Sequence, residues 1–150
     1  LNGNNEYRIL LIRMPVTQDE VQVSIDGVVF MNAKSEDTKP GAAIQFYRAN
    51  GILSNCVFNN NISLYSGGGA VAFIHTGTLN RIVNCEFNNN SAISGGAIYT
   101  GLRTNLEVIN STIVNNNCST GEGGGIFING QLQLFNNIIW GNKRMDSAIR

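Results

Sequence analysis

The 150-residue sequence predicts an all-β fold, a parallel β-helix of about five to six coils, from three observations. Apolar and polar residues alternate in short runs, such as Leu106-Glu107-Val108 and Ile44-Gln45-Phe46, which places every second side chain on one face of a strand. No apolar pattern has a helical period, and 23 Asn and 17 Gly favour turns. A large apolar anchor recurs at spacings of 28, 29, 26 and 26 residues, at Phe30, Phe58, Phe87, Ile113 and Ile139.

The chain opens with one extended run, Tyr7 to Arg13, followed by a polar turn, Pro15 to Glu20. We interpret the adjacent acids Asp19 and Glu20 as solvated loop charges, because neighbouring residues of a strand point in opposite directions. The repeats follow, and the charged, turn-prone insertion Lys34 to Pro40 is expected to form a surface loop.

Each anchor is followed by a second half of the repeat, which is rich in glycine. Glycine tolerates positive φ, so this half predicts a sharp turn into a strand. We expect the apolar columns headed by Phe58 and Ile98 to fill the interior between the sheets. The copies run from Gly41 to Ile44, Gly68 to Val71, Gly95 to Ile98 and Gly123 to Ile126, with a weaker copy from Asp146 to Ile149.

A column of asparagines lies three residues before the anchor and predicts a structural ladder. Stacked coils place equivalent residues about 4.8 Å apart. Buried Asn side chains can then pass hydrogen bonds from coil to coil and satisfy groups that would otherwise be costly to bury. The predicted inward ladder consists of Asn55, Asn84, Asn110 and Asn136.

These two half-repeats resemble the GGAI and FxxN tetrads of the polymorphic outer membrane protein family. Gly95 to Ile98 matches GGAI in full, whereas Phe58 to Asn61 and Phe87 to Asn90 match FxxN in full. The segments Ile113 to Asn116 and Ile139 to Asn142 carry Ile in place of Phe. The resemblance covers roughly residues 21 to 150 and implies a right-handed parallel β-helix of the pectin-lyase-like kind.

The resemblance also implies a bacterial protein that is secreted or displayed at the cell surface or outer membrane. Its expected role is an adhesin-like passenger or elongated scaffold, with a host or cell-surface protein or a glycan as partner. The tetrads are structural, so the resemblance supplies no catalytic, cofactor-binding or metal-binding residue. Two alternatives stay open: the structural part of a β-helix polysaccharide lyase or hydrolase, and a carbohydrate-binding module.

Composition is compatible with a single β-helix segment over residues 1–150, which we interpret as a fragment of a longer chain because solenoids normally carry caps. Ten basic and ten acidic residues cancel, and neither sign forms a run, so nucleic acid is not an expected partner. No apolar run approaches the ~20 residues of a transmembrane helix, so no membrane insertion by this segment is expected. The oligomeric state stays open.

The chain has three cysteines, Cys56, Cys85 and Cys118, without the spacing of a metal site. Cys56 and Cys85 share one column, two residues before the anchor. We favour a stack of small residues over a disulfide, because neighbours on parallel strands seldom meet the geometry that a disulfide needs.

No catalytic constellation emerges from the titratable residues. The carboxylates Asp26, Glu86, Glu107 and Glu122 fall in different columns, so they do not gather as Ca²⁺-dependent lyases or paired-acid hydrolases require. His75 follows a strand and precedes a turn, so we expect it at a rim without a catalytic partner. No cofactor is predicted. Arg81 shares a column with Glu107 and should form an exposed ion pair.

The candidate partner surface consists of aromatic residues that the alternation places on the outside. Flat aromatic side chains exposed together can contact a protein or stack on sugar rings. A missing segment of the parent chain that covers them is the alternative explanation. The candidates are Tyr99, Phe127, Phe135 and Trp140.

Overall fold

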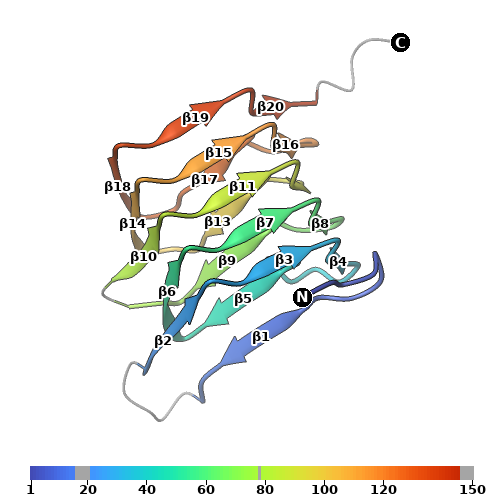
Figure 1. The fold of residues 1–150 in the computed structure, drawn as a ribbon. Helices are drawn as coiled ribbons and strands as arrows, with labels where there is room; N and C mark the ends of the chain where they lie inside the picture. The colour runs from blue at the N-terminus through green and yellow to red at the C-terminus, as the bar shows by residue number, and fades with distance from the viewer. Residues whose placement is uncertain (16–20, 78, 146–150) are drawn as a thin grey trace.

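The computed structural model describes residues 1–15, 21–77 and 79–145. Within these ranges the chain forms twenty β-strands in four parallel five-stranded sheets, and no helix. Each sheet takes one strand from every coil, so the strands stack into a solenoid of about five turns (Figure 1). The predicted parallel β-helix is therefore confirmed. The polar turn at Asp19 and Glu20 and the weak copy at 146–149 lie outside the described residues.

The four sheets are numbered by the order in which the chain visits them. The first sheet contains β1 (Leu10–Arg13), β5 (Ile44–Tyr47), β9 (Val71–Ile74), β13 (Ile98–Thr100) and β17 (Ile126–Phe127). The second contains β2 (Val21–Asp26), β6 (Ala49–Ser54), β10 (Asn80–Val83), β14 (Asn105–Ile109) and β18 (Gln131–Phe135). The third contains β3 (Val29–Met31), β7 (Val57–Asn59), β11 (Glu86–Asn88), β15 (Thr112–Val114) and β19 (Ile138–Trp140). The fourth contains β4 (Lys34–Ser35), β8 (Ile62–Ser63), β12 (Ser91–Ala92), β16 (Asn117–Cys118) and β20 (Lys143–Arg144).

The interior is filled by the two apolar columns that the repeat predicts. Phe30, Phe58 and Phe87 are fully buried and stack nearly parallel, with ring centroids 5.0 and 4.6 Å apart. Val71 and Ile98 are buried and paired in register on neighbouring strands of the first sheet. Equivalent side chains stack on one another in these columns, because in-register parallel pairing places each repeat position directly over its equivalent in the next coil.

The buried asparagine ladder lies at a different column from the predicted one. Asn55, Asn84, Asn110 and Asn136 are exposed, and all four have positive φ, between 50° and 58°. Their shared role is the left-handed turn between the second and third sheets, a conformation that Asn tolerates better than most residues. The prediction of an inward ladder was therefore wrong for this column.

This exposed column still carries hydrogen bonds at its early coils. Asn84 Nδ2 donates to Asn55 Oδ1 at 3.1 Å, and Asn55 Nδ2 donates to Asp26 Oδ1 at 2.8 Å. Hydrogen bonds from Ser54 and Asn55 hold the pKa of Asp26 below its usual range. The ladder exists there, on the outside of the coil.

The inward ladder is formed by the last residue of the FxxN tetrad. Asn61, Asn90 and Asn116 are fully buried. Their Nδ2 groups each donate at 2.9 Å to the Oδ1 atom of the next coil, from Asn61 to Asn90, from Asn90 to Asn116 and from Asn116 to Asn142. This column satisfies the buried turn between the third and fourth sheets.

The glycines in the second half of each repeat form the predicted turn and also allow the backbone of the neighbouring coil to approach closely. Gly68 and Gly95 have φ of 67° and 58° at the entrance to the first sheet. At Gly96 a Cβ atom would overlap the carbonyl oxygens of Gly124 and Asn117 in the next coil. Turn formation and close packing between coils therefore both select glycine here.

All three cysteines are buried and free. Cys56 lies directly below Cys85, whose Sγ accepts a hydrogen bond from the Cys56 backbone amide at 3.4 Å. The structure confirms the preference for a stack of small residues over a disulfide.

Candidate ligand-binding groove

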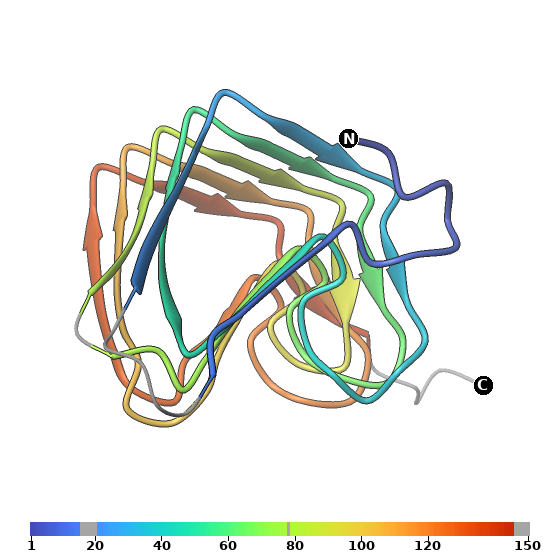
Figure 2. The same ribbon diagram turned by 90° about the horizontal axis from the view of Figure 1, so that it is seen from below.

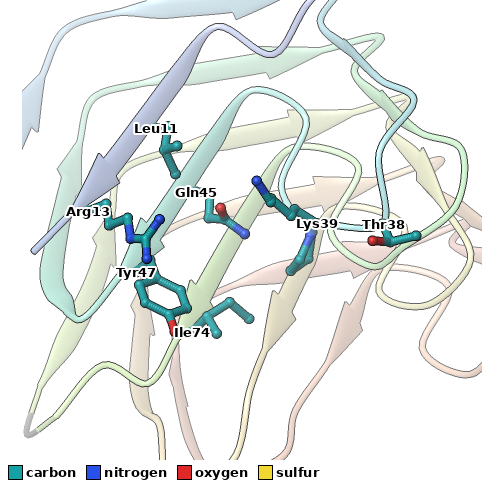
Figure 3. Close-up of a pocket in the computed structure, with 8 residues that line it drawn as sticks. Leu11, Arg13, Thr38, Lys39, Gln45, Tyr47 and Ile74 are labelled. Atoms are coloured by element: carbon teal, nitrogen blue, oxygen red, sulfur yellow. The ribbon is translucent and has the colours of Figure 1, made fainter. Parts of the chain in front are cut away.

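A groove of about 260 Å³ lies on the outer face of the first sheet, under the loop that joins β4 to β5 (Figure 3). Figure 2 shows the loops between the fourth and first sheets stacked along one edge of the solenoid. The first of these loops forms one wall of the groove, and the strands β1, β5 and β9 form its floor. Its lining consists of Leu11, Arg13, Thr38, Lys39, Pro40, Gln45, Tyr47 and Ile74.

Strand alternation explains why these side chains reach the groove. Ile44 and Phe46 point into the core and are fully buried, so Gln45 and Tyr47 of the same strand point outward. The parallel register then sets Arg13 beside Tyr47 on the neighbouring strand. The floor is therefore built on paired strands, which hold it rigidly.

Gln45 is the buried polar group of the floor. Its side chain points outward from the sheet, yet the loop above leaves the residue only 3% exposed. In Figure 3 its amide lies between Arg13 and Lys39. Among the described residues it has no hydrogen-bond partner. Solvent reaches the amide through the groove, and a bound ligand that offers a donor and an acceptor would take the place of that solvent.

Tyr47 orients two guanidinium groups beside the groove. The Cζ atoms of Arg13 and Arg48 lie 5.3 and 5.6 Å from the Tyr47 ring centroid, within the range of cation–π attraction. His75 packs against the same ring in an edge-on arrangement, with centroids 5.5 Å apart. The half-buried tyrosine thus fixes long side chains that would otherwise be mobile.

The wall of the groove is fastened by Arg8. Its Nη1 and Nη2 atoms donate to both oxygens of Asp37, at 3.0 and 2.9 Å. The same guanidinium donates to the backbone carbonyls of Lys39 and Gly41, at 2.7 and 2.8 Å. The hydrogen bonds from Arg8 hold the pKa of Asp37 well below its usual range. This clamp fixes Thr38 and Lys39 over the floor.

The groove lining combines polar and cationic groups with apolar side chains. It contains amide, hydroxyl and cationic groups beside apolar side chains, and it has no carboxylate, histidine or cysteine. Across the described ranges, no group of three or more His, Cys, Asp and Glu residues could hold a metal ion. General acid–base work by a carboxylate pair has no candidate at this site.

The four predicted surface aromatics do not form one site. Tyr99 and Phe127 stack on the outer face of the first sheet with centroids 5.3 Å apart, but both are half-buried. Gly67 and Gly68 lie against Tyr99, so the loop of the preceding coil covers it. Phe135 is 50% exposed on the second sheet, and Trp140 is 77% exposed on the third. Their separation on different sheets argues against a shared aromatic strip.

Except for His75, which packs against Tyr47, the other titratable residues singled out in the sequence lie away from the groove lining. Arg81 Nε and Glu107 Oε2 form the predicted ion pair at 2.8 Å on the second sheet. Asp26 lies at the end of β2, Glu86 in β11 of the third sheet, and Glu122 in the loop before β17. His75 follows β9 and is exposed, at the predicted rim position.

No sequence motif predicts the groove. Its residues come from three coils and one insertion, and no motif links them along the chain. One signal was present: Gln45 and Tyr47 are polar positions of a strand whose other positions are apolar, directly after a charged insertion. The groove forms because the loop stands above the strand, and the sequence carries no pattern that predicts this position of the loop.

The fold and the groove define a β-helical protein with a ligand-sized depression on one outer sheet. The model of the right-handed β-helix region matches residues 16–149, and the chain belongs to this family. Neither the curated proteins nor the solved structures contain a significant match to the chain. No helix among the described residues has the length and apolar character to cross a membrane.

Proposed function

We propose that this chain is a non-catalytic, adhesin-like scaffold of a secreted or cell-surface bacterial protein, and that it binds a glycan in the groove above Gln45. The GGAI and FxxN tetrads support the placement among polymorphic outer membrane protein repeats and hence at the cell surface. The observation that carries the binding function is the Gln45 amide, which lies in the floor of the open groove and makes no hydrogen bond to any described residue.

The mixed lining favours a glycan. Sugar rings offer hydroxyl groups for amide and hydroxyl partners, and C–H faces for apolar side chains. The groove presents the Gln45 amide and the Thr38 hydroxyl beside Leu11, Pro40 and Ile74. Its volume of about 260 Å³ lies just below the range of sites for drug-sized ligands, which suits one unit of a chain.

A rigid scaffold supports this role. Parallel ladders fix the floor, and the Arg8 clamp fixes the wall, so little conformational entropy is lost on binding. The other loops between the fourth and first sheets line the same edge, where they can extend the contact with a partner (Figure 2).

The test is glycan binding by the purified chain on an array of neutral and charged oligosaccharides, followed by calorimetry on the hits. Gln45→Ala should weaken binding by about tenfold, because the ligand loses its buried hydrogen bonds. Trp140→Ala is the matched control and should leave affinity unchanged, since Trp140 lies on the third sheet. Loss of binding in Trp140→Ala alone would move the site to the exposed aromatics.

A second assay separates binding from cleavage. Bound polysaccharide is incubated with the chain and followed by absorbance of unsaturated products and by reducing ends. No product is expected. Release of either product would contradict the non-catalytic proposal and favour a lyase or a hydrolase.

Antibody labelling of intact cells that produce the parent protein tests its location. Labelling without permeabilisation is the expected result, and signal only after permeabilisation would contradict surface display.

A further inference from the structure

Resting on the proposed glycan-binding function, we infer that the ligand is an anionic polysaccharide whose carboxylate or sulfate groups contact Arg13, Lys39 and Arg48. These cations surround the buried Gln45 amide and the Tyr47 ring. Arg13 and Lys39 line the groove from opposite sides (Figure 3). Arg48 lies outside the lining, with its Cζ atom 5.6 Å from the Tyr47 ring centroid.

These three cations have no acidic partner within the described residues, unlike others in the chain. Ion pairs of the described residues use Arg8 with Asp37, Lys34 with Glu36 and Arg81 with Glu107. Both acids of the groove loop, Glu36 and Asp37, are thus paired with cations outside the groove lining. The groove keeps the positive charge of Arg13 and Lys39 in a chain of zero net charge.

The geometry holds the cations in place before any ligand binds. The Tyr47 ring fixes both guanidinium groups, and the backbone of Lys39 is held by Asp37 and Arg8. Arg48 has φ of 58°, the left-handed corner conformation that His75 shares with φ of 51° at the equivalent position after β9. This corner places Arg48 beside the Tyr47 ring.

The arrangement fits a polysaccharide better than a nucleic acid. Arg13 and Arg48 occupy the surroundings of the Tyr47 ring, so the ring offers no free platform for the base stacking on which single-strand binding relies. The Gln45 amide offers one donor face and one acceptor face, which a sugar hydroxyl can use together. Guanidinium groups bind carboxylate and sulfate oxygens through paired hydrogen bonds.

The test measures binding to four polymers: heparin, polygalacturonate, neutral dextran and single-stranded DNA. We expect binding to heparin or to polygalacturonate, weakened by at least about tenfold between roughly 50 and 500 mM salt. Preference for heparin identifies sulfate as the recognised group, and preference for polygalacturonate identifies carboxylate.

Charge-removing variants assign that binding to the groove. Arg13→Gln and Lys39→Gln should each lower affinity for the anionic polymer by about tenfold. Arg81→Gln removes the same charge from the second sheet and should have no effect. Circular dichroism confirms that each variant is folded. Equal losses in all three variants would show a nonspecific charge effect and overturn the inference.

The outcomes separate this inference from the function on which it rests. Salt-independent binding of neutral glycans that depends on Gln45 would overturn the anionic ligand and leave the glycan-binding scaffold standing. Tighter binding of DNA than of either anionic polysaccharide would overturn the inference in favour of nucleic acid. Binding of no polymer here and of no glycan on the array would overturn both.

Discussion

The buried amide ladder makes the sharpest prediction about stability, through the substitution Asn90→Ala. Asn90 Oδ1 accepts hydrogen bonds from the backbone amide and the Nδ2 group of Asn61, at 3.0 and 2.9 Å. Its Nδ2 group donates to the Phe58 carbonyl at 3.0 Å and to Asn116 Oδ1 at 2.9 Å. Alanine removes all four bonds in a site that is sealed from water.

The magnitude follows from these four bonds. At about 1 kcal/mol of net stabilisation each, Asn90→Ala should lower the free energy of unfolding by about 4 kcal/mol. For a domain of this length that corresponds to a drop in Tm of roughly 8–16 °C. The loss is measured by urea denaturation and by thermal melts followed by circular dichroism.

The control is Asn84→Gly in the exposed column of the same coil. Asn84 makes one side-chain hydrogen bond in contact with solvent, and glycine tolerates its φ of 58°. We expect a loss below about 1 kcal/mol for this variant. If Asn90→Ala costs no more than Asn84→Gly, the reasoning that buried amide bonds hold the coils together is refuted.

Three further predictions concern the core, the coil contacts and the clamp. Phe58→Ala removes the centre of the phenylalanine stack and should cost about 3–5 kcal/mol in urea denaturation, whereas a loss under about 1 kcal/mol would contradict tight packing there. Gly96→Ala should lower the free energy of unfolding by about 2 kcal/mol or more, because the added Cβ meets the backbone of the next coil. Gly27→Ala is the control: its Cβ has free space, so it should cost only about 1 kcal/mol for its positive φ. Equal losses in the two variants would contradict close packing between the coils at Gly96. Arg8 lowers the pKa of Asp37 in the folded chain. At pH values above the unfolded pKa of about 3.9, the clamp therefore stabilises the fold. This contribution is lost as the pH falls from that value toward the lower pKa of the folded chain. Asp37→Asn should therefore flatten the decrease of the urea midpoint below about pH 4, and an unchanged pH profile would show that the clamp does not contribute.

The comparison of sequence with structure is clearest at the asparagine columns. Both columns are visible in the sequence, since Asn recurs three residues before and three after the anchor. The prediction placed the first column inside, whereas the structure buries the second. Periodicity fixes which residues stack, but the left-handed residue at each corner interrupts the alternation of inward and outward side chains and so decides which column faces inward.

The candidate site shows a different limit. Tyr99 and Phe127 were correctly placed on the outer face of a strand, yet the loop of the preceding coil covers Tyr99. Gln45 is an ordinary polar position of a strand in the sequence, yet the same kind of loop places it in the floor of a groove. Loop height above a sheet depends on contacts between coils, such as the clamp from Arg8 to Asp37 across 29 residues.

The sequence by itself determined the parallel β-helix, the in-register pairing of its coils and the phenylalanine core. It could do so because each of these depends on a local repeat, and stacking identical units buries the same positions in every coil. Tertiary structure alone decided which asparagines are buried, how the loops cover the outer face of the first sheet and which cations gather there. These features arise where coils and insertions that differ from one another meet, and a repeat pattern carries no information about such contacts.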